Sequence, residues 1–232
     1  MTVDVNENKM MLPINIKHVA LILLVLTVFK SKMKLGEDLS DKFVIVTEAA
    51  VQPKKNREKM ADLIFEKFGF GHALFETQAL LSLMAEGHNT GLVLDSGDGV
   101  THVIPVVEGQ VDEVAVREGR LNLAGHKVTD YLVRLLGNRG YAFNSTADFE
   151  VVREIKEQCC FVSYNREKDI KLAKETTLHD QNFTLPDGKT IRIGAERFLC
   201  AEALFNPSLI GVEDGGYHQK IYDVIEKCPI DV

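Results

Sequence analysis

Short runs of β-branched residues alternate with amphipathic stretches from Lys42 onward. The run KFVIVTE is followed by the helical stretch KKNREKMADLIFEKF, and then by HALFE, TQALLSLMAEG and GLVLDSG, which indicate strand, helix and strand. Such alternation is typical of an α/β sheet with some parallel strands. The break at Asp98-Gly99 leads directly into a further apolar run, THVIPVVEG, so a tight hairpin is predicted to join these two strands.

The second half of the chain has the spacing of helices. Apolar residues recur at helical intervals over 124–138 and 146–159, and the predicted buried stripes are Leu132, Leu135 and Leu136, then Phe149, Val152 and Ile155. The stretch NFTLPDGKTIRIG predicts a hairpin, because two alternating runs flank Pro186-Asp187-Gly188. Short helices are expected near 196–204 and 216–227.

One long apolar run, VALILLVLTVF, occupies residues 19–29. It is too short to cross a bilayer as a helix, which takes about 20 residues. Lysines follow it instead of a small-residue cleavage site, so a secretory signal is also a poor match. A buried strand or helix is predicted here.

Composition narrows the classes of partner. The 232 residues are enough for one large or two small domains. With 27 Lys plus Arg against 34 Asp plus Glu, the net charge of −7 argues against a surface that neutralises nucleic-acid phosphates. The four cysteines form no CxxC pair and no zinc-ligand spacing, so reduced thiols are expected.

The segment GLVLDSGDGVTH, residues 91–102, is the strongest candidate for chemistry. Asp95 ends an apolar strand, and Gly97 and Gly99 allow the backbone to approach a ligand without a Cβ in the way. Successive N–H groups in such a turn can cradle phosphate oxygens, and a neighbouring carboxylate can hold hydrated Mg²⁺. An ordinary hairpin turn has the same pattern, and both interpretations stay open on these residues alone.

Two polar residues near this segment suit phosphoryl chemistry. Gln78 could orient a water molecule and His102 could relay its proton during attack on a γ-phosphate. A purely structural role for His102 is the alternative. Lys156 and Glu157 lie in a predicted helix, where such a pair is usually a solvated face; they become site candidates only if that helix lines a cleft opposite Asp98.

Many of these strings resemble the actin superfamily, in the same order and at similar spacing, from about Leu35 to the C-terminus. They are TEAAVQPKKNREKM, TQALLSLMAEG, LDSGDGVTH, LAGHKVTDYL, REIKEQCCFV and ERFLCAEALFNPSLIG. The resemblance implies an actin-like ATPase fold, in which two ribonuclease-H-like α/β halves enclose a cleft for ATP and Mg²⁺. For this chain it implies an incomplete version, with a mixed sheet plus an inserted α+β subdomain.

Further strings place the resemblance within the superfamily. RGYAFNSTADFE, SYNREKDIKLAKETT and FTLPDGKTIRIGAERF are most similar to an actin-related subunit of the complex that nucleates branched actin filaments, with conventional actin as the second choice. This implies a cytoplasmic, cytoskeletal protein that binds ATP and has actin and the other subunits of that complex as partners. The alternatives are a truncated actin-like binding module without nucleotide, using the apolar loop 205–212, and, less favoured, a metabolic kinase with the same cleft architecture.

The resemblance also implies roles for individual residues. Asp95 matches the aspartate near the metal, and Gln78 and His102 match the residues that place and activate the attacking water. Gly125 matches a glycine near the ribose. The second phosphate loop is matched by Ser96, Gly97, Asp98, Gly99 and Val100, and Asp98 would also reach the ribose. Lys156 and Glu157 match the pair beside the adenosine.

Departures from the family pattern are equally informative. His126 and Lys127 replace an Arg-Asp pair at the cleft edge. No counterpart of the first glycine-rich phosphate loop occurs before Leu35, and the adenine loop of the family would lie beyond Val232. We therefore expect weak ATP binding and negligible hydrolysis by this chain.

The predicted organisation has four parts. Residues 1–34 are expected to be an unrelated extension, and a mispredicted start or a translated intron is the hypothesis for its origin. Residues 35–85 are expected to be a remnant of the outer small subdomain. Residues 86–121 and 211–232 are expected to form the inner core with the second phosphate loop, and 122–210 the inserted upper subdomain.

Overall fold

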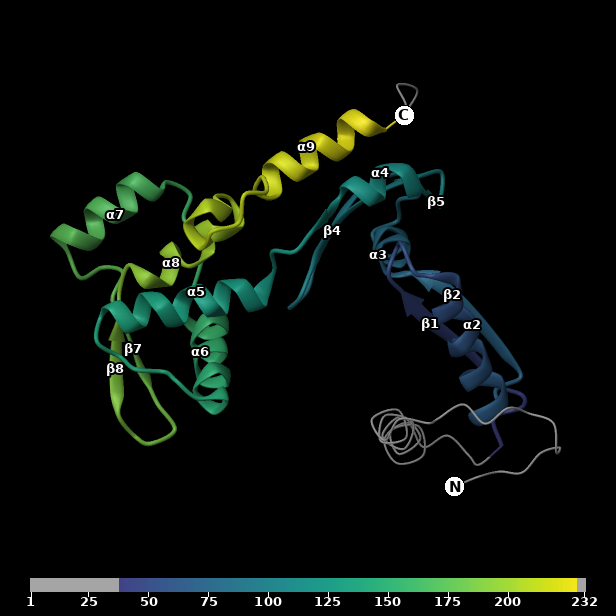
Figure 1. Ribbon diagram of the computed structural model, residues 1–232, viewed down its shortest axis with the longest axis horizontal. Coiled ribbons are helices and arrows are strands. Elements are labelled where there is room, and N and C mark those ends of the chain that lie inside the picture. Colours follow the sequence, from purple (N-terminus) through teal and green to yellow (C-terminus); the bar gives the residue numbers. More distant parts are fainter. Residues whose placement is uncertain (1–37, 229–232) are drawn as a thin grey trace. The chain divides into compact units, whose positions relative to one another are not determined.

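The computed structural model describes residues 38–228 (Figure 1). Within that range the chain divides into two compact units. The first holds residues 38–48 and 52–76, and the second holds 49–51 and 77–228. The predicted apolar run at 19–29, the extension 1–34 and the last four residues lie outside the described residues.

The first unit is a two-stranded sheet with a helical crossover. Strands β1 (Phe43–Glu48) and β2 (His72–Thr77) are connected by helix α2 (Lys54–Asp62), which continues into a π-helical turn, η2 (Leu63–Lys67). Every second strand residue enters the core, as the period of a half-buried strand requires. This core gathers around three buried side chains, with strand residues packed against them: Leu39, Ile64 and Phe70, then Val44, Val46, Ala73 and Phe75.

The sheet of the second unit is built from consecutive hairpins. Strand β3 (Gly91–Ser96) pairs with β4 (Thr101–Val107), which also pairs with the short strands β5 (Gln110–Val111) and β6 (Arg120–Leu121). Each of these pairings is antiparallel, because short turns join the strands. The parallel pairing expected from the alternating pattern is not among them.

Three helices pack on this sheet. They are α3 (Gln78–Ala85), α4 (Glu113–Glu118) and α9 (Tyr217–Lys227). α3 packs its buried Ala79 and Leu80 against Ile104 and Val106 of β4. On the other side of the strand, Val103 packs with Ala115 of α4 and Val224 of α9. Strand β4 is therefore held between helices on both of its faces.

A largely helical segment follows β6. It contains α5 (Gly125–Asn138), α6 (Thr146–Cys159), α7 (Arg166–Glu175) and α8 (Glu196–Leu199), the hairpin β7 (Gln181–Thr184) and β8 (Thr190–Ile193), and the 3-10 turns η3 (Ala201–Leu204) and η4 (Pro207–Ile210). α5 packs against α6 (Figure 1), and the β7–β8 hairpin adds to their shared core. The buried residues are Val128, Leu132 and Leu136 of α5, Val152 and Ile155 of α6, and Phe183, Ile191 and Ile193 of the hairpin.

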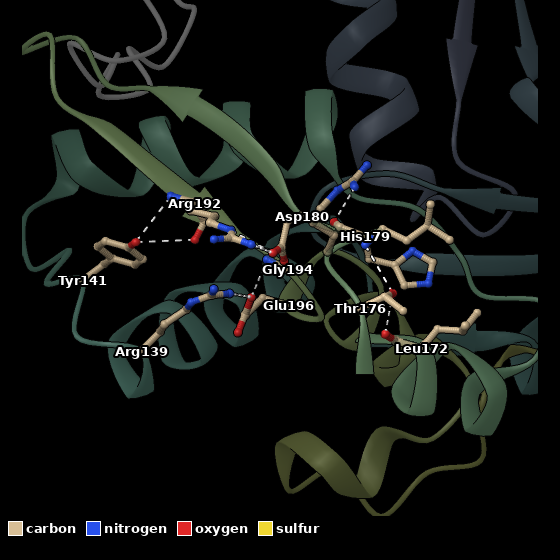
Figure 2. Close-up of polar contacts among 11 residues, drawn as sticks. Arg139, Tyr141, Leu172, Thr176, His179, Asp180, Arg192, Gly194 and Glu196 are labelled. Atoms are coloured by element: carbon tan, nitrogen blue, oxygen red, sulfur yellow. Dashed lines mark hydrogen bonds and ion pairs between the residues drawn. The ribbon is translucent and has the colours of Figure 1, made fainter. Parts of the chain in front are cut away.

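Polar contacts fasten the β7–β8 hairpin to its surroundings. Figure 2 shows the Arg192 guanidinium on the Asp180 carboxylate and the Arg139 guanidinium, at the end of α5, donating to Glu196 of α8 at 2.7 Å. Gly194 lies between these pairs, and a Cβ there would lie 2.5 Å from Asp180 Oδ1. A larger residue at position 194 would therefore have to displace the Asp180 carboxylate.

Most elements expected from the sequence are confirmed. The helix predicted over 146–159 is α6 with the same bounds, and hairpins form at Asp98-Gly99 and at Pro186-Asp187-Gly188. The mixed α/β content is confirmed, and all four cysteines are free thiols. Across residues 38–228, no helix has both the length and the apolar character needed to span a membrane.

Candidate functional site

The turn between β3 and β4 presents its backbone to solvent. The Gly97 amide donates to the Val100 carbonyl at 3.2 Å, which closes the turn. Gly97, Asp98 and Gly99 are exposed, and a Cβ added at either glycine would meet no atom within 4 Å. Neither glycine has a positive φ, so the turn conformation itself does not require them. Their missing side chains instead leave room for a group that approaches the backbone.

The peptide groups of this turn have unused hydrogen-bonding capacity. Within residues 38–228, the amides of Asp98 and Gly99 donate no hydrogen bond. Exposed N–H groups in successive positions are suited to anion oxygens. Asp95, half-buried at the end of β3, adds a carboxylate of the kind that holds hydrated Mg²⁺. These residues fit a magnesium-bound polyphosphate.

His102 lies directly opposite Asp95 in the β3–β4 pair, and Arg120 of β6 lies opposite His102 on the other side. Burial lowers the pKa of the His102 imidazole, and the Arg120 charge lowers it further, while the Asp95 carboxylate acts in the opposite direction. The neutral imidazole is thereby favoured. A neutral imidazole can accept a proton, as the predicted relay requires.

The turn also caps helix α5. The Gly97 carbonyl accepts from the Gly125 amide at 3.0 Å, and the Asp98 carbonyl accepts from the His126 amide at 2.8 Å. These bonds satisfy two of the amides that a helix N-terminus leaves unpaired. A Cβ on Gly125 would lie 3.3 Å from the Gly97 carbonyl oxygen, so glycine permits this close approach.

Lys156 joins the same cluster from α6. Its ammonium donates to the Gly125 carbonyl at 3.1 Å, which places a positive charge beside the turn and the start of α5. The neighbouring Glu157 is exposed and lies 3.9 Å from Arg153 on its own helix. The structure thus brings Lys156 to the turn, whereas Glu157 makes its contact along α6.

The imidazole of His126, one of the residues that depart from the family pattern, lies near two carboxylates and an aromatic ring. Its Nδ1 is 3.6 Å from Asp98 Oδ2, its Nε2 is 3.9 Å from Asp130 Oδ2, and its ring centre is 4.7 Å from that of Phe149. The His126 side chain therefore lies close to the Asp98 carboxylate.

Gln78 is the first residue of α3 and is exposed. Its backbone carbonyl accepts from the Ser82 hydroxyl at 3.0 Å. Helix α3 packs on the sheet that carries the turn, so Gln78 belongs to the same unit as Asp95 and His102. Its role in placing water stays a prediction.

Two residues at the base of the turn were missed in the sequence. The hydroxyls of Thr101 and Tyr217 lie 2.8 Å and 2.7 Å from the Ser96 Oγ. The strand register would have indicated Thr101, which lies directly opposite Ser96. No local pattern indicates Tyr217, because 121 positions separate it from Ser96.

Comparisons with known proteins agree with this structural picture. The family model described as Actin matches residues 23–232, a range that begins inside the predicted extension 1–34. Similar proteins include actin-related protein 2 of Schizosaccharomyces pombe, 49% identical over 199 residues that cover 86% of this chain and 50% of that protein. Actin-related protein 2 of Acanthamoeba castellanii is 50% identical over 198 residues, 85% of this chain and 50% of that protein.

The similarity extends to plants. Actin-related protein 2 of Arabidopsis thaliana is 47% identical over 203 residues, which cover 88% of this chain and 51% of that protein. The chain thus spans about half the length of the curated relatives it matches. Because the family model covers nearly the whole chain, the sequence belongs to the actin family and has an incomplete actin-like fold.

Proposed function

We propose that this chain is a cytoskeletal actin-related protein whose Asp95–Val100 turn forms one wall of a site for Mg²⁺ and ATP. The observation that carries the proposal is the exposed turn itself. It combines unpaired amides at Asp98 and Gly99 with the Asp95 carboxylate, and it is fixed to α5 by two backbone hydrogen bonds.

In this proposal Asp95 would hold the hydrated magnesium ion, which neutralises phosphate charge when bound. The amides of Asp98 and Gly99, with the neighbouring loop residues, would cradle phosphate oxygens. The Asp98 carboxylate and Gly125 would lie beside the ribose, and Lys156 and Glu157 beside the adenosine. Gln78 would orient water and neutral His102 would accept its proton, the roles that a complete two-walled site would need for ATP hydrolysis.

The similarity to proteins named actin-related protein 2 supports a proposal for the cellular role. We propose that the protein acts in the cytoplasm, at the cytoskeleton, where it would take part in the nucleation of branched filaments together with actin and the other subunits of the nucleating complex. Nucleotide binding would set the shape in which it assembles.

A single wall limits the affinity. A phosphate clamp surrounds charge with donors from both sides of a cleft that excludes water. Charge-assisted hydrogen bonds contribute about 1.5–3 kcal/mol each, so the loss of several weakens binding by several orders of magnitude. This chain alone should therefore bind Mg·ATP with a dissociation constant on the order of millimolar and hydrolyse it negligibly.

Equilibrium titration with a fluorescent ATP analogue in the presence of Mg²⁺ tests the affinity. The proposal predicts weak binding that Asp95→Asn abolishes. Asp187→Asn, in the other Asp-Gly hairpin turn, is the matched control and should leave the affinity unchanged. Micromolar affinity would show that a single wall suffices, and equal loss from both variants would show that the binding is unspecific electrostatics.

Co-purification tests the cellular role separately. The tagged chain, expressed in cells that contain actin and a branched-filament nucleating complex, should enrich subunits of that complex. Enrichment of chaperones alone would contradict the assembly role without bearing on the nucleotide site.

A further inference from the structure

Three hydroxyl groups meet at the base of the phosphate turn. Ser96 Oγ lies 2.8 Å from Thr101 Oγ1 and 2.7 Å from the Tyr217 hydroxyl, and the latter two oxygens lie 3.0 Å apart. Thr101 and Tyr217 are buried, while Ser96 is exposed. An exposed serine of the candidate turn is thus anchored, through its hydroxyl, to the first residue of α9.

The hydrogens of this cluster can be accounted for one by one. Thr101 donates to the Leu123 carbonyl at 2.6 Å, so its single hydrogen is already used. A Ser96 hydroxyl that donates outward to a ligand can still accept a hydrogen bond from within the protein. Of the two hydroxyls beside it, Tyr217 is the one with a hydrogen to give, because its own bond to the Leu123 carbonyl is long, at 3.4 Å.

We propose that Tyr217 is a positioning residue for the phosphate turn, which donates to Ser96 Oγ and so aims the Ser96 hydrogen at a phosphate oxygen. Without ligand, the Ser96 hydrogen is accepted inside the cluster by Thr101 Oγ1, 2.8 Å away. With a polyphosphate bound, it turns outward while the bond from Tyr217 is kept. Tyr217 thereby links α9 to the ligand-binding turn. This inference rests on the proposed polyphosphate site.

Removal of a single hydroxyl provides the test. Tyr217→Phe keeps the ring, whose centre is 6.4 Å from that of Phe205, and deletes the donor. Tyr222→Phe is the matched control on the same helix, because the Tyr222 hydroxyl is exposed and donates to Glu226. Amide chemical shifts of the turn are followed by NMR during titration with magnesium tripolyphosphate, and in a second series with adenosine.

We expect Tyr217→Phe to weaken the affinity for magnesium tripolyphosphate about threefold to tenfold, the effect of one hydrogen bond. Adenosine affinity should stay unchanged, and Tyr222→Phe should match the parent chain in both series. In a Ser96→Ala background, Tyr217→Phe should cause no further loss, because the two residues act on the phosphate as one unit.

Several outcomes would overturn the inference. These are an unchanged tripolyphosphate affinity in a folded Tyr217→Phe variant, an equal loss for adenosine, or losses from Ser96→Ala and Tyr217→Phe that add. If Tyr217→Phe does not fold, 3-fluorotyrosine at position 217 offers a more acidic donor, which should tighten tripolyphosphate binding; an unchanged affinity contradicts the proposal. A parent chain that shows no response to tripolyphosphate refutes the proposed function and this inference together, whereas a responding parent with an unaffected variant refutes the inference alone.

Discussion

His102 connects the chemistry of the candidate site with protein stability. Its pKa is lowered by burial and by Arg120, so the folded protein binds fewer protons than the unfolded chain at mildly acidic pH. The stability gained from the neutral ring is fully present above the ordinary histidine pKa of about 6.5 and decreases as the pH falls below it. A neutral imidazole at physiological pH, as the proposed proton relay needs, and a pH-sensitive fold are thus two effects of one environment.

Chemical denaturation at a series of pH values between about 5 and 8 measures this link. The parent chain should lose stability as the pH falls, and His102→Gln should flatten the slope because the titrating ring is gone. His88→Gln, at an exposed histidine, should keep the slope of the parent. A slope that His102→Gln leaves intact would assign the pH dependence to other groups.

Two helix glycines, Gly137 and Gly119, differ in the room that their surroundings leave for a side chain. Gly137 lies in the last turn of α5, where a Cβ meets nothing within 4 Å. Gly119 ends α4, and a Cβ there would overlap the Val103 carbonyl of β4. Backbone atoms of a buried strand cannot move aside as a flexible side chain can.

Gly137→Ala is therefore expected to raise the free energy of unfolding by about 0.5–1 kcal/mol, through lower unfolded-chain entropy and better helix propensity. Gly119→Ala should lower it by more than about 2 kcal/mol. Thermal and urea denaturation of both variants checks the pair. Similar effects of the two substitutions would contradict the packing described for α4 on β4.

The elements that the sequence predicted well are those with local signals. Helix α6 was bounded correctly from its long apolar stripe, and the structure shows a capping box of Ser145 and Asp148 at its start. Helix α4 and strands β5 and β6 were missed, since they span six, two and two residues and are too short to show a period. The same holds for the candidate site. Asp95 and its turn are contiguous and could be found from the sequence, whereas Tyr217 contacts Ser96 only through tertiary packing.

The first unit leaves much of its sheet uncovered. Phe43 and Ile45 of β1 are 59% and 53% exposed, and Leu74 of β2 is 43% exposed. Their strand neighbours point the other way, into the core around Ile64 and Phe70. Large exposed apolar residues on one sheet face favour association with other surfaces.

We expect the purified chain to self-associate and to bind a hydrophobic fluorescent dye. Phe43→Ser with Ile45→Thr should reduce both without loss of structure, because these side chains lie outside the core. A substitution pair at exposed positions elsewhere, Tyr164→Ser with Leu178→Ser, is the control for a general gain in solubility. Equal reduction by both pairs would remove the sheet face as the cause, as would a dispersed parent chain that binds no dye.

For the molecule as a whole, the chain combines an actin-family sequence with about half the length of its curated relatives. We expect the shorter length to lower the affinity for ligand more than the stability of the site, because hydrogen bonds hold the turn, α5 and α6 together within one unit. Local contacts fix the position of the turn, and we expect the single wall to limit the affinity of the proposed site.

Whether the Asp95–Val100 turn binds Mg·ATP can be measured by mapping backbone amide shifts during titration. We expect the perturbations at millimolar ligand to concentrate on Ser96 to Val100 and on the contacting residues Gly125 and Lys156, and to spare the Asp-Gly turn at 187–188. Perturbations spread evenly over both turns, or confined to surfaces away from Asp95, would contradict it.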